Sequence, residues 1–295
     1  MSVMRHVSAM QGKTGVILLV LIVSLVLVSI TVRSRTNDPD SQPEWDPPES
    51  FEVTAMVQTT DGGFALAGGT KSHAAWCGFC APSDYEGGDM LLLKTDANGV
   101  MTWNQSYGGP YLDVPSALIQ TTDGGFALAG ITNVYGIGGS DFWLVKVDAH
   151  GMMTWNQSYG GPNLDVPSGL VRTTDGEFVL AGSTELDGAG NWDMWLVKTD
   201  DNGKEEWNHT YGKTESDGAK SVIETVDGGF ALAGWTWSFG NEDMWLVKTD
   251  ASGNVTWKQT IPQYGYAGHE DIAYALVQTT DGGFALAGST NRYFG

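Results

Sequence analysis

Aspartates recur at fixed places in this sequence, and their type and spacing could bind a cation. One set lies in D-x-x-G turns: Asp96, Asp148, Asp200 and Asp250. Calcium binds six to eight oxygens that converge from nearby positions, and these turns resemble such loops only loosely. An Asp side chain also commonly bonds the backbone of its own turn. We therefore expect a structural role for these aspartates and no cofactor, with calcium as the alternative.

Two cysteines form a second pattern with chemical meaning. Cys77 and Cys80 follow Trp76, and the run Trp-Cys-Gly-Phe-Cys is similar to the W-C-G-x-C site of thioredoxin-like proteins. That site needs a helix N-terminus to lower the thiol pKa, and no helix is expected in the loop 71–88. Two cysteines also cannot supply the four thiolates of a zinc site within one chain. In an exported domain we expect a local disulfide between them.

Aromatic residues outside the regular pattern are the candidates for binding. The loop 71–88 is an insertion and contributes four of them: His73, Trp76, Phe79 and Tyr85. Three further tryptophans lie in or beside later loops: Trp192, Trp235 and Trp237. Tryptophans that recur in every repeat are expected to pack between repeats instead, because a regular place indicates a structural role. The recurring tryptophans include Trp103, Trp155, Trp207 and Trp257.

Four asparagine sequons could accept a glycan in an exported protein. They are Asn104, Asn156, Asn208 and Asn254, and each is expected at the last strand of its repeat. Duplication of one chance triplet explains the series equally well. Both explanations stay open.

Catalytic motifs are missing from the sequence. It contains no G-x-S-x-G, H-E-x-x-H or phosphate-binding loop, and the four histidines beyond residue 50 fall at different places in the repeat. Only Arg172 and Arg292 follow residue 50, so an arginine cluster of the sialidase kind cannot form. The sequence favours a protein without catalytic activity and assigns no catalytic or cofactor-binding residue.

These residues are carried by a repeat whose clearest copy reads TTDGGFALAG at 121–130. Its turn aspartates, Asp61, Asp123, Asp175, Asp227 and Asp281, are spaced by 62, 52, 52 and 54 residues. Each repeat predicts four short strands: 117–122, 126–132, 141–148 and 152–159 in the second copy. The inner strands are apolar on both faces and the last one is polar, as in a propeller blade. We expect an all-β fold, a β-propeller of four-stranded antiparallel blades.

The order strand, DG turn, strand, D-[FM]-W-L-V-K, turn, Trp resembles the blades of WD-repeat and quinoprotein-type propellers. Within residues 51–295 the likeness is greatest to prokaryotic cell-surface proteins built from TTDGGFALAG-type repeats. That resemblance implies a fold and no particular activity. The expected blades are 51–115, 116–167, 168–218, 219–271 and a partial blade at 272–295. The partial blade suggests a fragment of a longer protein, or self-association that completes an open propeller.

The first fifty residues predict a membrane anchor. Residues 14–32 carry no charge and span about 28 Å as a helix, close to the thickness of a bilayer. We expect a cytoplasmic leader at 1–13, a transmembrane helix at 14–33 that contacts the lipid bilayer, and a proline-rich stalk at 34–50. The N-terminus is expected inside, so that the propeller faces outward from the cell membrane.

Charge distribution narrows the range of partners. The chain has 35 acidic and 15 basic residues, and every acidic residue lies beyond residue 36. Such a surface repels nucleic acid, which we therefore exclude as a partner, and it suits cationic partners. The favoured function is a single-pass surface module for binding or adhesion, with a glycan or a surface protein as ligand. A quinone- or metal-dependent propeller enzyme and a purely structural envelope protein are the alternatives.

Overall fold

The computed structural model describes residues 7–9, 16–19, 52–70, 88–133, 139–185, 192–212, 215–238, 241–261 and 269–292. Every regular element in these ranges is a β-strand. The chain divides into two compact units, one formed by residues 27–172 and the other by residues 1–26 with 173–295. Each unit is described by itself.

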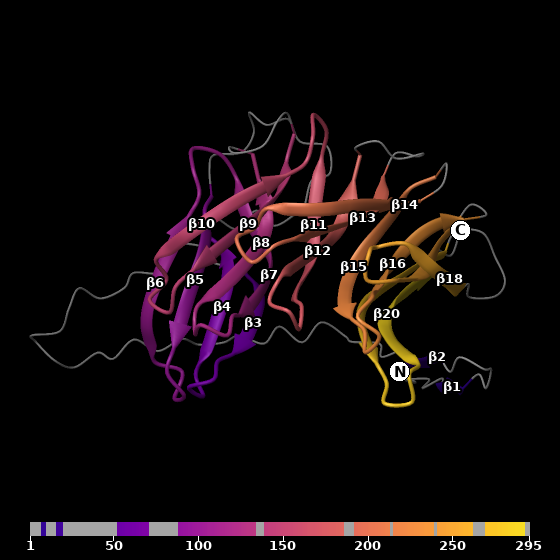
Figure 1. Ribbon diagram of the computed structural model, residues 1–295, viewed down its shortest axis with the longest axis horizontal. Helices are drawn as coiled ribbons and strands as arrows, with labels where there is room; N and C mark the ends of the chain where they lie inside the picture. Colours follow the sequence, from indigo (N-terminus) through magenta and orange to yellow (C-terminus); the bar gives the residue numbers. More distant parts are fainter. Residues whose placement is uncertain are drawn as a thin grey trace, which may run out of the picture. The chain divides into compact units, whose positions relative to one another are not determined.

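The unit 27–172 contains two complete four-stranded antiparallel sheets (Figure 1). The first sheet consists of β3 (Glu52–Gln58), β4 (Phe64–Gly69), β5 (Met90–Thr95) and β6 (Met101–Tyr107). The second consists of β7 (Asp113–Gln120), β8 (Phe126–Thr132), β9 (Asp141–Val147) and β10 (Met153–Tyr159), and β11 (Asp165–Arg172) follows. In both sheets neighbouring strands are consecutive in the chain, as predicted for a blade.

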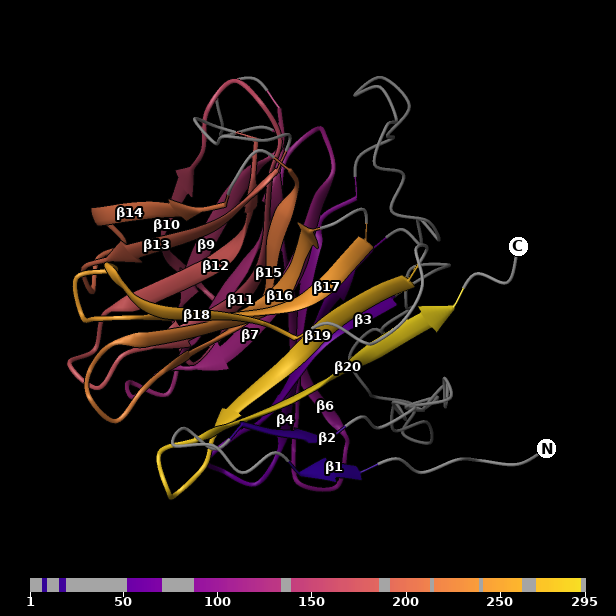
Figure 2. The same ribbon diagram turned by 90° about the vertical axis from the view of Figure 1, so that its right-hand side faces the viewer.

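The unit that contains residues 173–295 continues the same pattern. It begins with β12 (Phe178–Thr184), β13 (Asp193–Thr199) and β14 (Glu205–Tyr211). A complete sheet follows, made of β15 (Asp217–Glu224), β16 (Phe230–Ser238), β17 (Asn241–Thr249) and β18 (Val255–Ile261). The hairpin of β19 (His269–Gln278) and β20 (Phe284–Arg292) lies beside that sheet (Figure 2).

Burial along the strands follows the predicted pattern. Every residue of β9 is buried, whereas β10 is mostly half-buried or exposed. The bounds predicted for the first strand of the second repeat, 117–122, are wrong, because β7 begins at Asp113 and ends at Gln120. The turn after it occupies residues 121–125, where Thr121 N donates to the carbonyl of Gly125 and Gly124 N donates to the carbonyl of Thr121.

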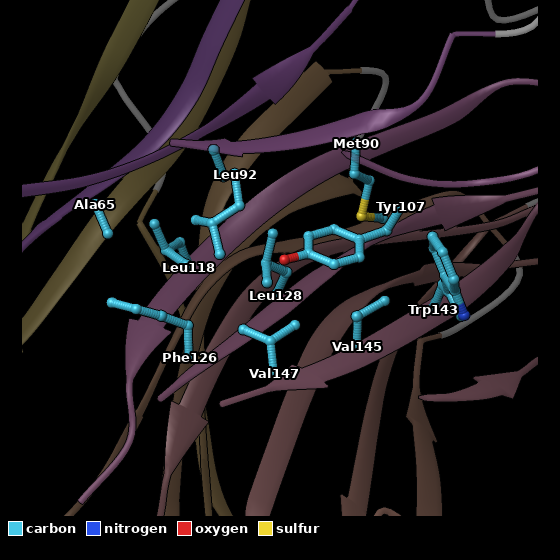
Figure 3. Close-up of a cluster of buried hydrophobic side chains, with 11 residues drawn as sticks. Ala65, Met90, Leu92, Tyr107, Leu118, Phe126, Leu128, Trp143, Val145 and Val147 are labelled. Atoms are coloured by element: carbon cyan, nitrogen blue, oxygen red, sulfur yellow. The ribbon is translucent and has the colours of Figure 1, made fainter. Parts of the chain in front are cut away.

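Small residues let consecutive sheets approach one another. In the unit 27–172, the side chains of Ala65 and Ala67 in β4 join a buried cluster with Leu118 and Leu128 of the next sheet. Figure 3 shows Leu92 of β5 packed above these two leucines. The alanine face of the TTDGGFALAG phrase therefore contacts the following repeat.

The N-terminal segment is described only at β1 (Val7–Ala9) and β2 (Val16–Leu19). These strands pair with each other, and β2 pairs in parallel with β20 from Phe284 to Leu286. A strand thus occupies residues at which the sequence predicts the start of a helix, since a run of Val, Ile and Leu suits either element. Among the described residues no helix is long and apolar enough to cross a membrane. The rest of 14–33 lies outside the described ranges, so the anchor stays a prediction.

Candidate functional site

The aspartates of the D-x-x-G turns bond their own backbone. Asp148 Oδ1 accepts hydrogen bonds from the backbone N–H groups of His150 at 2.8 Å and Met152 at 2.9 Å. These bonds lower the pKa of Asp148. The same two bonds form at the three equivalent residues, Asp96, Asp200 and Asp250. Turn formation therefore accounts for the recurrence of this set. In the described part of the chain no three His, Cys, Asp or Glu side chains gather as metal ligands would.

A repeated ion pair, which the sequence analysis missed, connects the inner turn to the third strand. In the last complete sheet, Lys248 Nζ donates to Asp227 Oδ1 at 3.0 Å and to the carbonyl of Thr249 at 2.7 Å. Lys94 and Lys146 make the same contacts to Asp61 and Asp123. Each lysine recurs near the end of the third strand, and the antiparallel register places it beside the DG turn. This recurrence could have predicted the pair.

Three of the regular tryptophans pack against the next repeat, which confirms the role predicted for them. Trp103 of β6 contacts Phe126 of the next sheet edge-on, with ring centroids 5.9 Å apart. Trp207 and Trp257 make the corresponding contacts with Phe230 and Phe284. Hydrophobic burial and this edge-on geometry make each Trp–Phe pair an anchor between consecutive repeats.

The sequon asparagines do not form one uniform set. Asn156 and Asn208 lie on the last strands of their sheets, and their Oδ1 atoms accept hydrogen bonds from the indole N–H groups of Trp143 and Trp195. Asn104 also lies on a last strand. Asn254 precedes β18 and belongs to the D-x-x-G turn, where its N–H bonds Asp250. The placement predicted for Asn254 is therefore wrong, because that sequon arose in the turn and not in the repeated strand motif.

Several predicted residues lie outside the described part of the chain. They belong to the insertion 71–88 and comprise the cysteines Cys77 and Cys80 and the binding candidates His73, Trp76, Phe79 and Tyr85. The disulfide and the contact role of this loop stay predictions.

The structure places the backbones of the other three binding candidates beside the start of β15. The backbone carbonyl of Trp192 accepts a hydrogen bond from Asp217 N at 2.7 Å, and Trp237 N donates to the carbonyl of Ser216 at 2.8 Å. The indole of Trp235 lies against Gly218. We call Trp192, Trp235 and Trp237, with the segment 216–218 between them, the tryptophan site.

Gly218 creates the space in which Trp235 lies. A Cβ on Gly218 would meet Trp235 Nε1 at 2.8 Å. In the strand register Gly218 pairs with Trp235, whereas the equivalent pair in the second repeat is Val114 with Ile131. The repeat has thus exchanged two medium side chains for one very small and one very large side chain at this site.

An extension of one hairpin brings further groups to the site. β16 and β17 have nine residues each, against seven in β8 and β9. The extra residues include Trp237 and Glu242, which are directly opposite each other in the register. Trp237 is 42% exposed, so its indole is accessible to a ligand. Side chains directly opposite in an antiparallel pair share one face, so this indole and this carboxylate are neighbours.

Ionisable side chains accompany the tryptophans. Glu242 pairs with Glu270 of β19 in a parallel register, and burial together with the Glu270 charge raises the pKa of Glu242. Lys220, on the bulge of β15, lies within electrostatic range of Glu242, and burial lowers its pKa. Shifted pKa values of neighbouring groups are typical of binding and catalytic sites. The sequence analysis did not find Lys220, Glu242 and Glu270, because only the register places them beside the tryptophans.

A second group of carboxylates is buried at the crossovers between sheets. A Cβ on Gly108 would lie 2.4 Å from Asp89 Oδ1 and 2.7 Å from Asp113 Oδ2. Pairs of aspartates flank Gly160 and Gly212 in the same way. Asp113 Oδ2 accepts a hydrogen bond from Gly109 N at 2.9 Å. Burial raises the pKa of Asp113, and the Asp89 charge raises it further. These pairs belong to the repeated framework, since they recur where the tryptophan site does not.

Comparisons with known proteins show the fold. No protein-family model matches the chain, and no curated protein matches it. A chain of hydrazine synthase from Kuenenia stuttgartiensis superposes with a TM-score of 0.50 at 14% identity, covering 83% of this chain. This chain spans 57% of the hydrazine synthase chain. An α-L-arabinanase from Penicillium chrysogenum, complexed with arabinobiose, gives a TM-score of 0.49 at 12% identity over 82% of this chain and 83% of its own.

The protein is thus all-β, built from repeated four-stranded antiparallel sheets of the β-propeller kind. At these identities the likeness extends to the fold alone. Neither the predicted cell-surface family nor the particular likeness to WD-repeat and quinoprotein blades follows from it.

Proposed function

We propose that the protein is a binding module displayed at a cell surface, and that its ligand binds at the tryptophan site. The supporting observation is the departure of this site from a framework that is otherwise copied from repeat to repeat. Val114 and Ile131 are replaced there by Gly218 and Trp235, and the adjoining hairpin is extended to carry Trp237.

Substitution Trp237→Ala tests this proposal in the full-length protein. Binding to arrays of glycans and of surface proteins would be compared with that of Val226→Ala, in which an exposed apolar residue of the turn between β15 and β16 is shortened. We expect binding to be lost in Trp237→Ala and kept in Val226→Ala. A ligand that binds both variants equally, and is lost only when residues 71–88 are deleted, would move the site to that loop.

Display at the surface is the second part of the proposal. It is supported by the uncharged run at 14–32, which is long enough to span a bilayer, and by the proline-rich segment 34–50 that follows it. Protease added to intact cells should remove the acidic domain and leave the membrane-associated N-terminal segment. Full protection of the domain in intact cells would contradict this topology.

Self-association is a further element of the proposal. β20 is paired with β19 along its length, and on its other side with β2 only from Phe284 to Leu286. Once residues 14–33 are inserted in a membrane, that side of β20 becomes an edge at which another strand could pair. Light scattering of a 34–295 variant should therefore show association that grows with concentration, and a monomer at all concentrations would oppose it.

A further inference from the structure

Trp237 and Glu242 combine an apolar face with a carboxylate on one side of the sheet. They are opposite each other between β16 and β17, so their Cβ atoms are separated by about 5 Å. Glu270 continues the row on β19. A ligand group that covers the indole therefore has two carboxylates next to it.

The surroundings of this row favour a positive ligand. The whole chain has a formal net charge of −20, and Glu215 lies exposed just before β15. A negative surface raises the local concentration of cations and speeds the association of cationic partners. Burial and the neighbouring Glu270 also raise the pKa of Glu242, which shows that its negative charge is costly in the free protein. A bound cation next to Glu242 relieves that cost.

The chain contains the same kind of contact within itself. Lys258 Nζ lies 5.7 Å from the ring centroid of Trp245, on the strands β18 and β17 of the same sheet. A tryptophan face attracts an ammonium or guanidinium group that lies over it. Trp245 has its cation in the chain, whereas Trp237 offers an exposed indole to a cation from outside.

From these contacts we infer that the tryptophan site binds lysine or arginine side chains of a basic peptide segment. The inference rests on the proposed binding function and assigns its ligand class. A long side chain of this kind has an apolar stem that covers the indole and a charged end that reaches the adjacent carboxylate.

Lys220 offers a control in which binding of a cation should become stronger. Its ammonium lies within electrostatic range of Glu242 and repels a second cation brought to that carboxylate. Removing the Lys220 charge should therefore strengthen the binding of a cation. A ligand without charge would respond little to the change.

Calorimetric titration of the full-length protein with a tetralysine peptide and with its fully acetylated counterpart tests the inference. We expect the lysine peptide to bind and the acetylated peptide not to bind. Glu242→Gln should weaken binding about tenfold, as for the loss of a charged partner, and Lys220→Met should strengthen it. The affinity should also fall as salt is raised.

The outcomes separate the ligand class from the proposed function. If Trp237→Ala abolishes binding of a neutral array ligand while Glu242→Gln and Lys220→Met leave it unchanged, the site is correct and the cationic ligand is wrong. Tighter binding of a glucosamine oligomer than of tetralysine would overturn the inference that the ligand is a basic peptide. If Trp237→Ala leaves the binding of every ligand unchanged, the proposed function fails as well.

Discussion

At the scale of single residues, this protein is dominated by carboxylates whose environments differ in opposite ways. Asp227 accepts hydrogen bonds from Thr225 and Lys248, which lower its pKa to about 2. Asp113 is buried beside Asp89, which raises its pKa. The first aspartate stabilises the fold as an anion, and the second stabilises it when protonated. The repeat therefore contains two groups of carboxylates with opposite responses to pH.

Removing Asp227 should destabilise the protein more than removing its ion-pair partner Lys248. The lysine side chain is 6% exposed and the aspartate 63% exposed. Asp227→Asn leaves a buried ammonium without its anion, and we expect it to lower the free energy of unfolding by about 1–2 kcal/mol. Lys248→Met leaves only an exposed carboxylate, so a smaller loss is expected. Urea denaturation measures both variants, and an equal or larger loss in Lys248→Met would contradict the assignment.

The pH dependence of this pair has a definite sign. The folded-state pKa of Asp227 is below its unfolded value, so its contribution is complete above about pH 4. It is lost as pH falls toward 2. The difference in unfolding free energy between the natural protein and Asp227→Asn should shrink over that interval.

Asp113 should show the reverse dependence. Its folded-state pKa lies above the unfolded value, so the protonated group stabilises the fold at low pH, and stability is lost as pH rises through the raised pKa. Asp113→Asn keeps an acceptor for Gly109 N and removes the charge next to Asp89 and Thr132. Thermal unfolding should show this variant to be more stable than the natural protein at pH 7, with no such gain at pH 3. If added calcium stabilises only the natural protein, the pair holds a cation and not a proton.

At the scale of elements, the contact between consecutive repeats passes through the last strand and the turn of the next sheet. Trp103 of β6 lies against Phe126 and against Gly151 of the following D-x-x-G turn. Tyr107 adds a hydrogen bond to the carbonyl of Gly151 at 2.7 Å. One turn thus closes its own hairpin and receives the aromatic side chains of the sheet before it.

A matched pair of glycines separates these two roles. Gly99 and Gly151 occupy the same turn position, both at a φ of +78°. A Cβ on Gly99 meets nothing within 4 Å, whereas a Cβ on Gly151 would lie 2.8 Å from Trp103. Gly99→Ala should cost about 1–2 kcal/mol for the left-handed backbone alone, and Gly151→Ala should cost more. Equal losses of unfolding free energy in chemical denaturation would show that Trp103 does not pack against the turn at Gly151.

Much of the element scale could be predicted from the sequence. The period of about 52 residues, the doubly apolar strands and the polar last strand were sufficient for the blade, and β7 to β10 confirm it. The tryptophan site was predicted only in part. Trp192, Trp235 and Trp237 stood out because they break the repeat, but Lys220 and Glu242 became part of the site only through the bulge of β15 and the extended hairpin. Periodicity reports what recurs and carries no signal for a hairpin that is extended in one repeat.

At the scale of the whole molecule, the repeat provides a scaffold, and the proposed binding site lies where one repeat departs from it. The framework contacts recur in both units: the turn aspartates, the lysine ion pairs and the Trp–Phe anchors. The combination of Gly218, Trp235 and Trp237 occurs in one repeat alone among those described. If that division is correct, the site can be removed without loss of the scaffold.

Gly218→Val is the measurement that tests this claim most directly. Valine occupies the equivalent place at Val114, so the strand accepts it, but its side chain takes the space of Ser183 Oγ and of the Trp235 indole. Ligand binding and thermal unfolding of the full-length protein would be measured together. We expect binding to be lost while the unfolding temperature stays within a few degrees of the natural value. Binding that persists unchanged in a folded Gly218→Val protein would contradict it.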